Sequence, residues 1–175
     1  SLDIAKQAID WQIEQSQDHS ELGVAFFGGE PLLNFPVIRE TIKYAHGRGK
    51  QFGKHFSFEV TTNGTLLNDD KRAYFLKNNV RVHISFDGSP EIQDRNRPFK
   101  NGMGSYDTVI PKIKKQLKAV PKTECRATLV GNIDGLDARK SMAEIGFNVV
   151  HFSVAADSEL NERLNKRLQR NEFWE

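Results

Sequence analysis

Apolar residues recur along this 175-residue chain with two alternating periods, one helical and one strand-like. Spacings of three and four residues indicate amphipathic helices, and short runs with a period of two indicate strands. The pattern predicts helices over 4–17, from Pro36 to the glycines at 47 and 49, and over 69–78, 105–117 and 136–145. It predicts strands over 22–27, 56–62, 80–86, 125–130 and 149–154, and a polar loop over 88–104.

The order of these elements predicts the fold class, because strands alternate with helices of about 10 to 15 residues. Such an order implies a parallel sheet with right-handed crossover connections. The 88–104 loop belongs to the same domain, since the strand–helix rhythm resumes unchanged after it. We therefore expect one α/β domain over 1–157, followed by a polar, helical segment over 158–175 that leads toward a further domain.

The predicted strands are apolar on one face only. Side chains alternate along a strand, so the third strand opposes Val80, Val82, Ile84 and Phe86 to Arg81, His83, Ser85 and Asp87. A parallel sheet covered on both faces shows nearly continuous apolar runs instead. The polar face predicts a curved sheet with helices outside and a concave side that holds a ligand. An ordinary doubly wound sheet with several edge strands is the alternative.

The charge balance and the cysteine count exclude several classes of protein. The chain has 25 Lys and Arg against 23 Asp and Glu, so no basic face indicates a nucleic-acid partner. Its one cysteine, Cys125, excludes a disulfide framework and a cysteine-rich zinc or iron–sulfur site made by this chain alone. No run approaches the roughly 18 apolar residues of a membrane span. The N-terminus lacks the features of a signal peptide, so we expect a cytoplasmic protein with no membrane partner.

Glycine-containing turns with polar side chains follow three successive strands. They read Gly28-Gly29-Glu30-Pro31, Thr62-Asn63-Gly64-Thr65 and Phe86-Asp87-Gly88. Glycine lets a ligand approach the backbone closely, and active sites of parallel α/β folds lie at the carboxyl ends of the strands. We expect a site that binds a polar small molecule through backbone groups and a few carboxylates.

Four motifs, in order, resemble those of the radical S-adenosylmethionine (radical SAM) superfamily. Residues 26–33, FFGGEPLL, resemble its GGEP motif, residues 60–67, VTTNGTLL, its TNGTLL motif, and residues 84–88, ISFDG, its SxDG motif. DRNR at 94–97 followed by GMGSY at 102–106 resembles the HDxxR…GxGSY stretch of the branch that carries a C-terminal SPASM domain. That branch contains the anaerobic sulfatase-maturating enzymes and other peptide and protein maturases.

The resemblance implies a partial (β/α)6 barrel of TIM-like form and an enzyme with two cofactors. In the family, a [4Fe–4S] cluster binds S-adenosylmethionine and cleaves it reductively, and the resulting radical abstracts hydrogen from a peptide or protein substrate. Carried onto this sequence, Gly28, Gly29 and Glu30 receive the methionine ammonium group. A carboxylate and carbonyls suit a cationic donor. Ser85 matches the family position that contacts the polar end of the cofactor, and Asn63, at a strand end beside it, either contacts the ligand or only forms the turn.

The resemblance and the alternation of side chains assign roles to two further residues. Asp87 orients loops or takes part in proton transfer. Arg126 faces the cofactor's carboxylate or forms an ion pair with Glu59, and its position fits both readings. His83 and His151 lie on the same polar face, where an interior histidine with ordinary partners is the more frequent case.

The chain departs from the family pattern in one respect, because it lacks the CxxxCxxC motif that follows the family's first strand. Cys125 lies on the apolar face of its strand and is expected to be buried, so no metal ligand is assigned. We interpret the chain as an internal fragment, inactive alone, whose first strand, cluster loop and SPASM domain belong to a longer parent.

Two alternatives to an enzyme core of this family remain open. The first is a non-catalytic, cluster-less module that binds a peptide partner. The second is an aldolase-like barrel that uses a lumen lysine, which ranks lower because no predicted strand places a lysine on its polar face.

Overall fold

The computed structural model describes residues 1–130 and 135–155. The helices are α1 (Leu2–Gln15), η1 (Pro31–Asn34, a 3-10 helix), α2 (Phe35–Phe52), α3 (Asp69–Lys77), α4 (Pro90–Asn96), α5 (Tyr106–Ala119) and α6 (Gly135–Ile145). The strands are β1 (Glu21–Phe26), β2 (His55–Thr62), β3 (Val80–Ser85), β4 (Glu124–Leu129) and β5 (Val150–Val154). The predicted helix over 158–174 lies outside the described residues. The chain divides into two compact units, 1–83 and 84–175.

The strands form a sheet whose order follows the chain, β1-β2-β3-β4-β5. β1 pairs with β2 in parallel, from Glu21 opposite His55 to Phe26 opposite Val60. β4 likewise pairs with β5 in parallel. A doubly wound sheet reverses its strand order at a switch point, whereas this order has no reversal. The topology is therefore that of a β/α barrel, and the doubly wound alternative is wrong.

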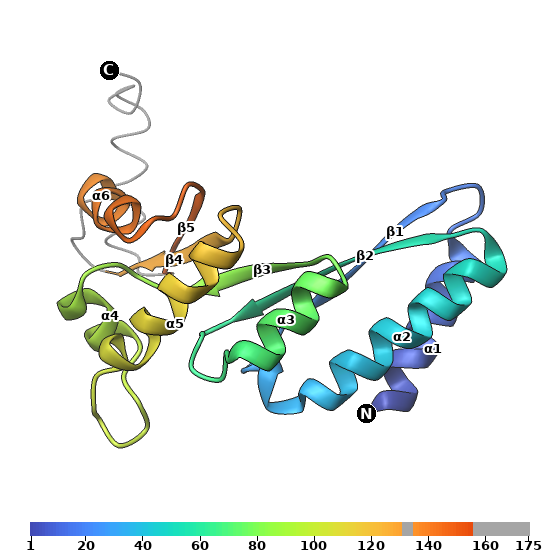
Figure 1. Ribbon diagram of the computed structural model, residues 1–175, viewed down its shortest axis with the longest axis horizontal. Coiled ribbons are helices and arrows are strands. Elements are labelled where there is room, and N and C mark those ends of the chain that lie inside the picture. Colours follow the sequence, from blue (N-terminus) through green and yellow to red (C-terminus); the bar gives the residue numbers. More distant parts are fainter. Residues whose placement is uncertain (131–134, 156–175) are drawn as a thin grey trace. The chain divides into compact units, whose positions relative to one another are not determined.

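In the first unit, α1 and α2 pack side by side, and α2 packs on β2 (Figure 1). Their buried apolar side chains form the core of the unit: Ile9, Ile13, Ile38, Ile42, Ala45, Phe58 and Val60. The apolar stripe predicted for the first helix is only partly buried, since Ile4 is 67% exposed. The stripe is wider than the face that α2 covers.

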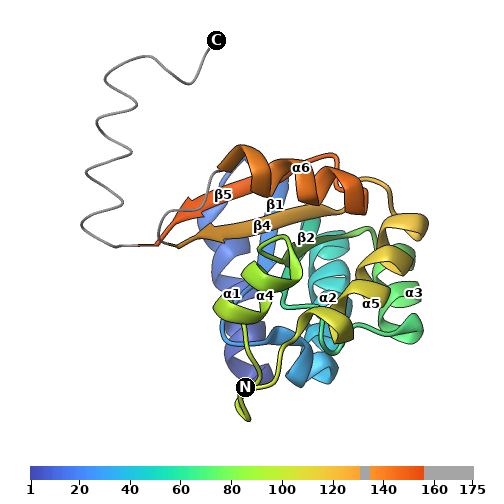
Figure 2. The same cartoon turned by 90° about the vertical axis from the view of Figure 1, so that its left-hand side faces the viewer.

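In the second unit, α6 lies along β4 and β5, while α4 and α5 pack together (Figure 2). The core of this unit includes Phe86, Val109, Ile113, Cys125, Ala127, Met142 and Phe147. The buried positions of β4 are Cys125 and Ala127, as the alternation of its side chains predicts. Among all the helices of the described ranges, none is long and apolar enough to cross a membrane.

Helix α4 lies within the segment that the sequence pattern predicts to be a polar loop. Ser89 precedes it as the N-cap, and the Ser89 Oγ accepts a hydrogen bond of 3.5 Å from the backbone N–H of Ile92. Pro90 takes the first helical position, where its missing N–H is not needed. The Ser-Pro pair is the signal of a helix start, but a seven-residue helix is too short to show a periodic apolar stripe.

Two glycines of α2 provide a matched test of packing against helix propensity. A Cβ at Gly49 would lie 2.5 Å from the backbone oxygen of Lys54, whereas a Cβ at Gly47 would meet nothing within 4 Å. We expect Gly47→Ala to stabilise the protein by up to about 1 kcal/mol through helix propensity. We expect Gly49→Ala to destabilise it by about 1 to 3 kcal/mol through overpacking. Urea unfolding measures both, and equal effects of the two substitutions would contradict the packing.

Candidate functional site

Glu30 joins the turn after β1 to the turn after β2. Its Oε1 accepts hydrogen bonds from the hydroxyl of Thr62 at 2.8 Å and from the backbone N–H of Leu32 at 3.0 Å. Its Oε2 accepts a hydrogen bond from the backbone N–H of Asn63 at 2.8 Å. A carboxylate offers about four acceptor positions, and three of them are filled here by the chain's own donors.

Asn63 shapes the second turn through its side-chain oxygen. The Asn63 Oδ1 accepts hydrogen bonds from the backbone N–H and the hydroxyl of Thr65, at 2.9 and 2.7 Å. This arrangement is an Asx-type turn. The structure thus brings Asn63 and Glu30 together, as two predicted site residues, and commits much of their hydrogen-bonding capacity to the turns themselves.

The turn at Gly28 and Gly29 fits the approach of a ligand to the backbone. Both glycines are exposed, and a Cβ at either position would meet nothing within 4 Å. Gly28 has a φ of 128°, a conformation that side chains other than glycine's strongly disfavour. Open backbone groups beside a carboxylate suit the ammonium group of an amino-acid-like ligand.

Glu59 has partners on the neighbouring strand of the first unit. Its Oε2 lies 3.4 Å from the Nε2 of His83 and 3.7 Å from the Nη2 of Arg81. The three side chains share the predicted polar face of β2 and β3. His83 is buried at 4% exposure, so it is an interior histidine with an acidic partner.

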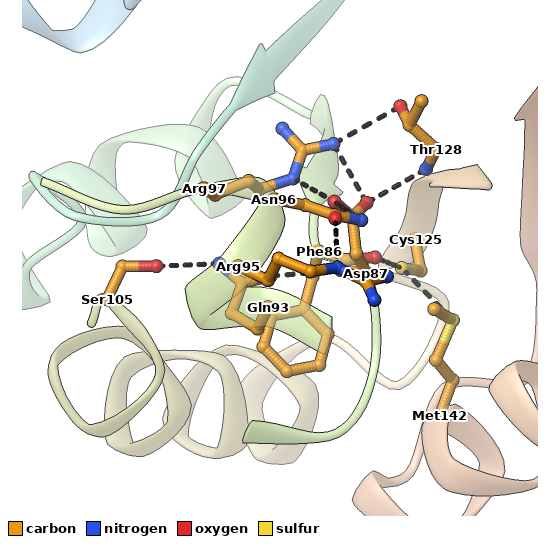
Figure 3. A network of polar contacts seen from close by, with 10 residues as sticks. All are labelled: Phe86, Asp87, Gln93, Arg95, Asn96, Arg97, Ser105, Cys125, Thr128 and Met142. Atoms are coloured by element: carbon orange, nitrogen blue, oxygen red, sulfur yellow. Dashed lines mark hydrogen bonds and ion pairs between the residues drawn. The ribbon is translucent and has the colours of Figure 1, made fainter. Parts of the chain in front are cut away.

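Asp87 forms the centre of a hydrogen-bond network in the second unit (Figure 3). Arg97 donates to both oxygens of its carboxylate, from Nε and Nη2, each at 2.9 Å. The backbone N–H of Thr128 donates at 2.8 Å and the side-chain amide of Asn96 at 3.3 Å. Asp87 is only 2% exposed. The network therefore ties the end of β3 to the end of β4 and to the end of α4.

The residues between α4 and α5 extend this network. Gln93 stands where the family motif has histidine, and its Oε1 accepts a hydrogen bond of 3.0 Å from the backbone N–H of Asp87. Its Nε2 donates to the hydroxyl of Ser105 at 2.9 Å. Asp94 accepts a hydrogen bond of 2.7 Å from the backbone N–H of Tyr106. Ser105 makes no side-chain cap bond to α5, so Asp94 satisfies the first turn of that helix.

Two other predicted site residues lie in the second unit. Ser85 is half-buried at the last position of β3, and Arg126 is exposed on the face of β4 that also carries Thr128. The guanidinium of Arg126 has no hydrogen bond or ion pair with any residue that the structure describes. His151 lies on β5 opposite Arg126, and its Nε2 is 2.7 Å from the Oε2 of Glu124. The second unit thus presents a polar strip along β4 and β5.

Sequence reasoning missed three residues that hold these turns: Thr62, Gln93 and Arg97. Thr62 is a polar residue on the apolar face of β2, next in order to Phe58 and Val60, and it is 1% exposed. A buried hydroxyl requires a hydrogen-bond partner, so its place on the apolar face could have predicted a bond to a nearby polar group. Arg97 lies in the DRNR motif and Gln93 directly before it, but only the folded structure shows that Asp87 is their partner.

Cys125 does not have the properties of a cluster ligand. It is fully buried, and burial together with the nearby Asp87 charge raises the pKa of its thiol to about 12. Its Sγ lies 3.1 Å from the backbone oxygen of Phe86. Among the described residues, no group of three His, Cys, Asp or Glu side chains is placed to hold a metal ion. The described residues therefore do not provide the thiolate ligands of an iron–sulfur cluster.

Residues 5–138 match the family model described as the Radical SAM superfamily. This match covers more than half of the sequence, and the chain belongs to the radical SAM superfamily. The enzymes of this family use S-adenosylmethionine and a [4Fe–4S] cluster.

Several named relatives are sulfatase-maturating enzymes. A cysteine-type anaerobic sulfatase-maturating enzyme of Clostridium novyi is 37% identical over 91 residues, which are 51% of this chain and 24% of that protein. A serine-type anaerobic sulfatase-maturating enzyme of Bacteroides thetaiotaomicron is 31% identical over 113 residues, 63% of this chain and 26% of that protein. The matched part of the chain thus spans about a quarter of the length of these relatives.

A solved structure has the same fold. It is described as native anSMEcpe with bound AdoMet and Kp18Cys peptide, and it matches with a TM-score of 0.80 at 19% identity. The match covers 89% of this chain and 43% of that chain. Together with the sequential parallel sheet, this likeness confirms the predicted partial (β/α)6 barrel.

The ion pair between Asp87 and Arg97 is expected to be strongly coupled. Removing one member of a buried pair leaves an uncompensated charge and costs about 3 to 5 kcal/mol. We expect Asp87→Asn to cost about 3 kcal/mol of unfolding free energy, whereas Asp18→Asn, at an exposed aspartate, costs almost nothing. A double-mutant cycle of Asp87→Ala and Arg97→Ala, measured by urea unfolding, would show a coupling above about 1 kcal/mol. Additive effects would contradict the network.

The raised pKa of Cys125 predicts a loss of stability at alkaline pH. The unfolded thiol releases its proton near its ordinary pKa of 9.0, but the folded thiol keeps it until about 12. Stability therefore falls as the pH rises above 9.0, by about 1 kcal/mol on going from about pH 8 to about pH 10. The test compares urea unfolding of the wild type with that of Cys125→Ala, which has no thiol at this position, across this pH range. Rapid alkylation of native Cys125 near neutral pH would contradict its burial.

Proposed function

We propose that this chain is the cofactor-binding core of a radical SAM enzyme that modifies a peptide or protein. The observation that carries the proposal is the open turn at Gly28 and Gly29, beside a Glu30 carboxylate held against the next turn. Family membership supports the cofactor. The sulfatase-maturating relatives, and a solved structure of Streptococcus suis SuiB bound to precursor peptide SuiA that has a TM-score of 0.56, support a peptide substrate.

In this proposal the chain's own residues bind and orient the polar end of S-adenosylmethionine. Backbone groups of Gly28 and Gly29 and the remaining acceptor position of Glu30 receive the ammonium group. Ser85, Asn63 and Arg126 are the other proposed contacts, with Arg126 directed to the carboxylate. When bound with its cluster, the cofactor supplies a radical that abstracts hydrogen from the substrate.

The proposal assigns Asp87 to positioning rather than to proton transfer. Four hydrogen bonds from Arg97, Asn96 and Thr128 occupy its carboxylate, and the side chain is 1% exposed. The carboxylate therefore has no acceptor position left for a bound substrate. It holds the ends of β3 and β4 at a fixed distance instead.

We further propose that the chain alone is inactive because it does not assemble the cluster. Its one cysteine is buried and stays protonated near neutral pH, whereas iron–sulfur clusters are held by cysteine thiolates. The cluster ligands, and the SPASM domain, would come from other parts of a longer protein. Anaerobic treatment of the 175-residue chain with iron and sulfide should yield colourless protein.

The decisive experiment uses the full-length protein that contains this sequence. After anaerobic reconstitution with iron and sulfide and chemical reduction, it should convert S-adenosylmethionine to 5′-deoxyadenosine, measured by chromatography. Glu30→Gln should lower the rate about tenfold or more, since it replaces an acceptor of charge-assisted bonds. Glu40→Gln, at an exposed glutamate of α2, is the matched control and should leave the rate unchanged.

The same experiment separates the two functional classes. Reduced, cluster-containing protein that forms no 5′-deoxyadenosine would overturn the enzyme proposal. A full-length protein that takes up no iron but still binds a peptide would support the non-catalytic module instead.

A further inference from the structure

Thr62 is a buried polar residue whose hydroxyl contacts a candidate site residue. It ends β2 on the face that packs into the core with Phe58 and Val60, and its exposure is 1%. Its hydroxyl donates to the Glu30 Oε1 at 2.8 Å and accepts from the backbone N–H of Gly64 at 3.1 Å. Both bonds fix the direction of the hydroxyl group. The side chain therefore belongs to the interior, although its partner Glu30 faces the candidate site.

The remaining bonds of Glu30 show what the hydroxyl holds in place. The backbone N–H groups of Leu32 and Asn63 donate to the two different oxygens of the carboxylate, at 3.0 and 2.8 Å. The first belongs to the turn after β1 and the second to the turn after β2. With Thr62 as the third donor, three hydrogen bonds from two turns and a strand end restrict the rotation of the carboxylate.

We propose that Thr62 is a positioning residue, which sets the orientation of Glu30 and thereby the spacing of the two glycine turns. The open acceptor position of Glu30 is then directed at the ammonium group of an amino-acid-like ligand before that ligand arrives. This inference rests on the proposed function for the identity of the ligand. It differs from that proposal in assigning part of the affinity to a residue that the ligand never contacts.

The substitution that isolates this role is Thr62→Val, which removes the hydroxyl and keeps the side-chain shape. Thr62→Ser restores the hydroxyl and is the rescue variant. Thr41→Val is the matched control, because Thr41 is also buried, at 2% exposure, and its hydroxyl donates to the backbone oxygen of Val37 at 2.8 Å in α2. Thr62→Val removes the bond to Glu30 and the bond from the Gly64 N–H, whereas Thr41→Val removes one bond within α2.

The first measurement is amide hydrogen exchange by NMR on the 175-residue chain. In Thr62→Val, the amides of Leu32 and Asn63 should exchange about tenfold faster relative to the rest of the first unit. Thr41→Val should change all amides of the unit together and leave these two unchanged in relative rate. Equal relative rates in Thr62→Val and the wild type would overturn the coupling between Thr62 and the two turns.

The second measurement is the dissociation constant of S-adenosylmethionine for the full-length, cluster-loaded protein. Thr62→Val should raise it about tenfold, Thr62→Ser should restore it, and Thr41→Val should not change it. An unchanged affinity in Thr62→Val, with the wild type binding normally, would overturn the positioning role alone. Failure of the wild type to bind S-adenosylmethionine would overturn the proposed function, while the exchange result would still test the coupling.

Discussion

Both units depend on one kind of interaction. A carboxylate that follows one strand accepts a hydrogen bond from a backbone N–H at the end of the next strand. Glu30, after β1, accepts from Asn63, after β2. Asp87, after β3, accepts from Thr128 in β4. Parallel strands place their carboxyl ends at the same edge, where the backbone leaves the sheet and loses its ladder partners. A charged acceptor at that point satisfies the free donors and fixes the distance between neighbouring turns.

Both carboxylates accept hydrogen bonds from backbone N–H groups at strand ends, but they differ in how far they are buried. Glu30 stays half-buried and keeps one acceptor position, so it combines a structural role with a proposed binding role. Asp87 is enclosed by Arg97, Asn96 and Thr128. Enclosing a charge is stable only when it is paired and fully hydrogen-bonded, and Asp87 meets that condition. Similar motifs in the sequence, each an acidic residue beside glycine, thus lead to different chemistry.

Much of the fold was predictable from the sequence, because each strand and most helices have a strong local signal. Asn68, for example, caps α3 as expected, with its Oδ1 accepting from the backbone N–H of Lys71. The parallel sheet followed from the alternation of strands with helices, but that alternation left a doubly wound order open, and the structure decided between the two. Helix α4 was not predicted, since it is short and its stability comes from Gln93 and its partners in the second unit. The candidate site residues were selected by motif, but their partners depend on contacts between distant residues, which periodicity does not encode.

The segment between α4 and α5 has hydrogen bonds to the rest of the second unit near both of its ends, and its middle is held by its own backbone bonds. Arg97 anchors one end and Asp94, through Tyr106, anchors the other. Between them, Phe99 and Met103 close a small turn with backbone bonds of their own. These turn bonds involve neither a strand end nor Asp87. Substitutions at Lys100, which is exposed in this turn, therefore change the surface of the second unit without removing a bond to Asp87.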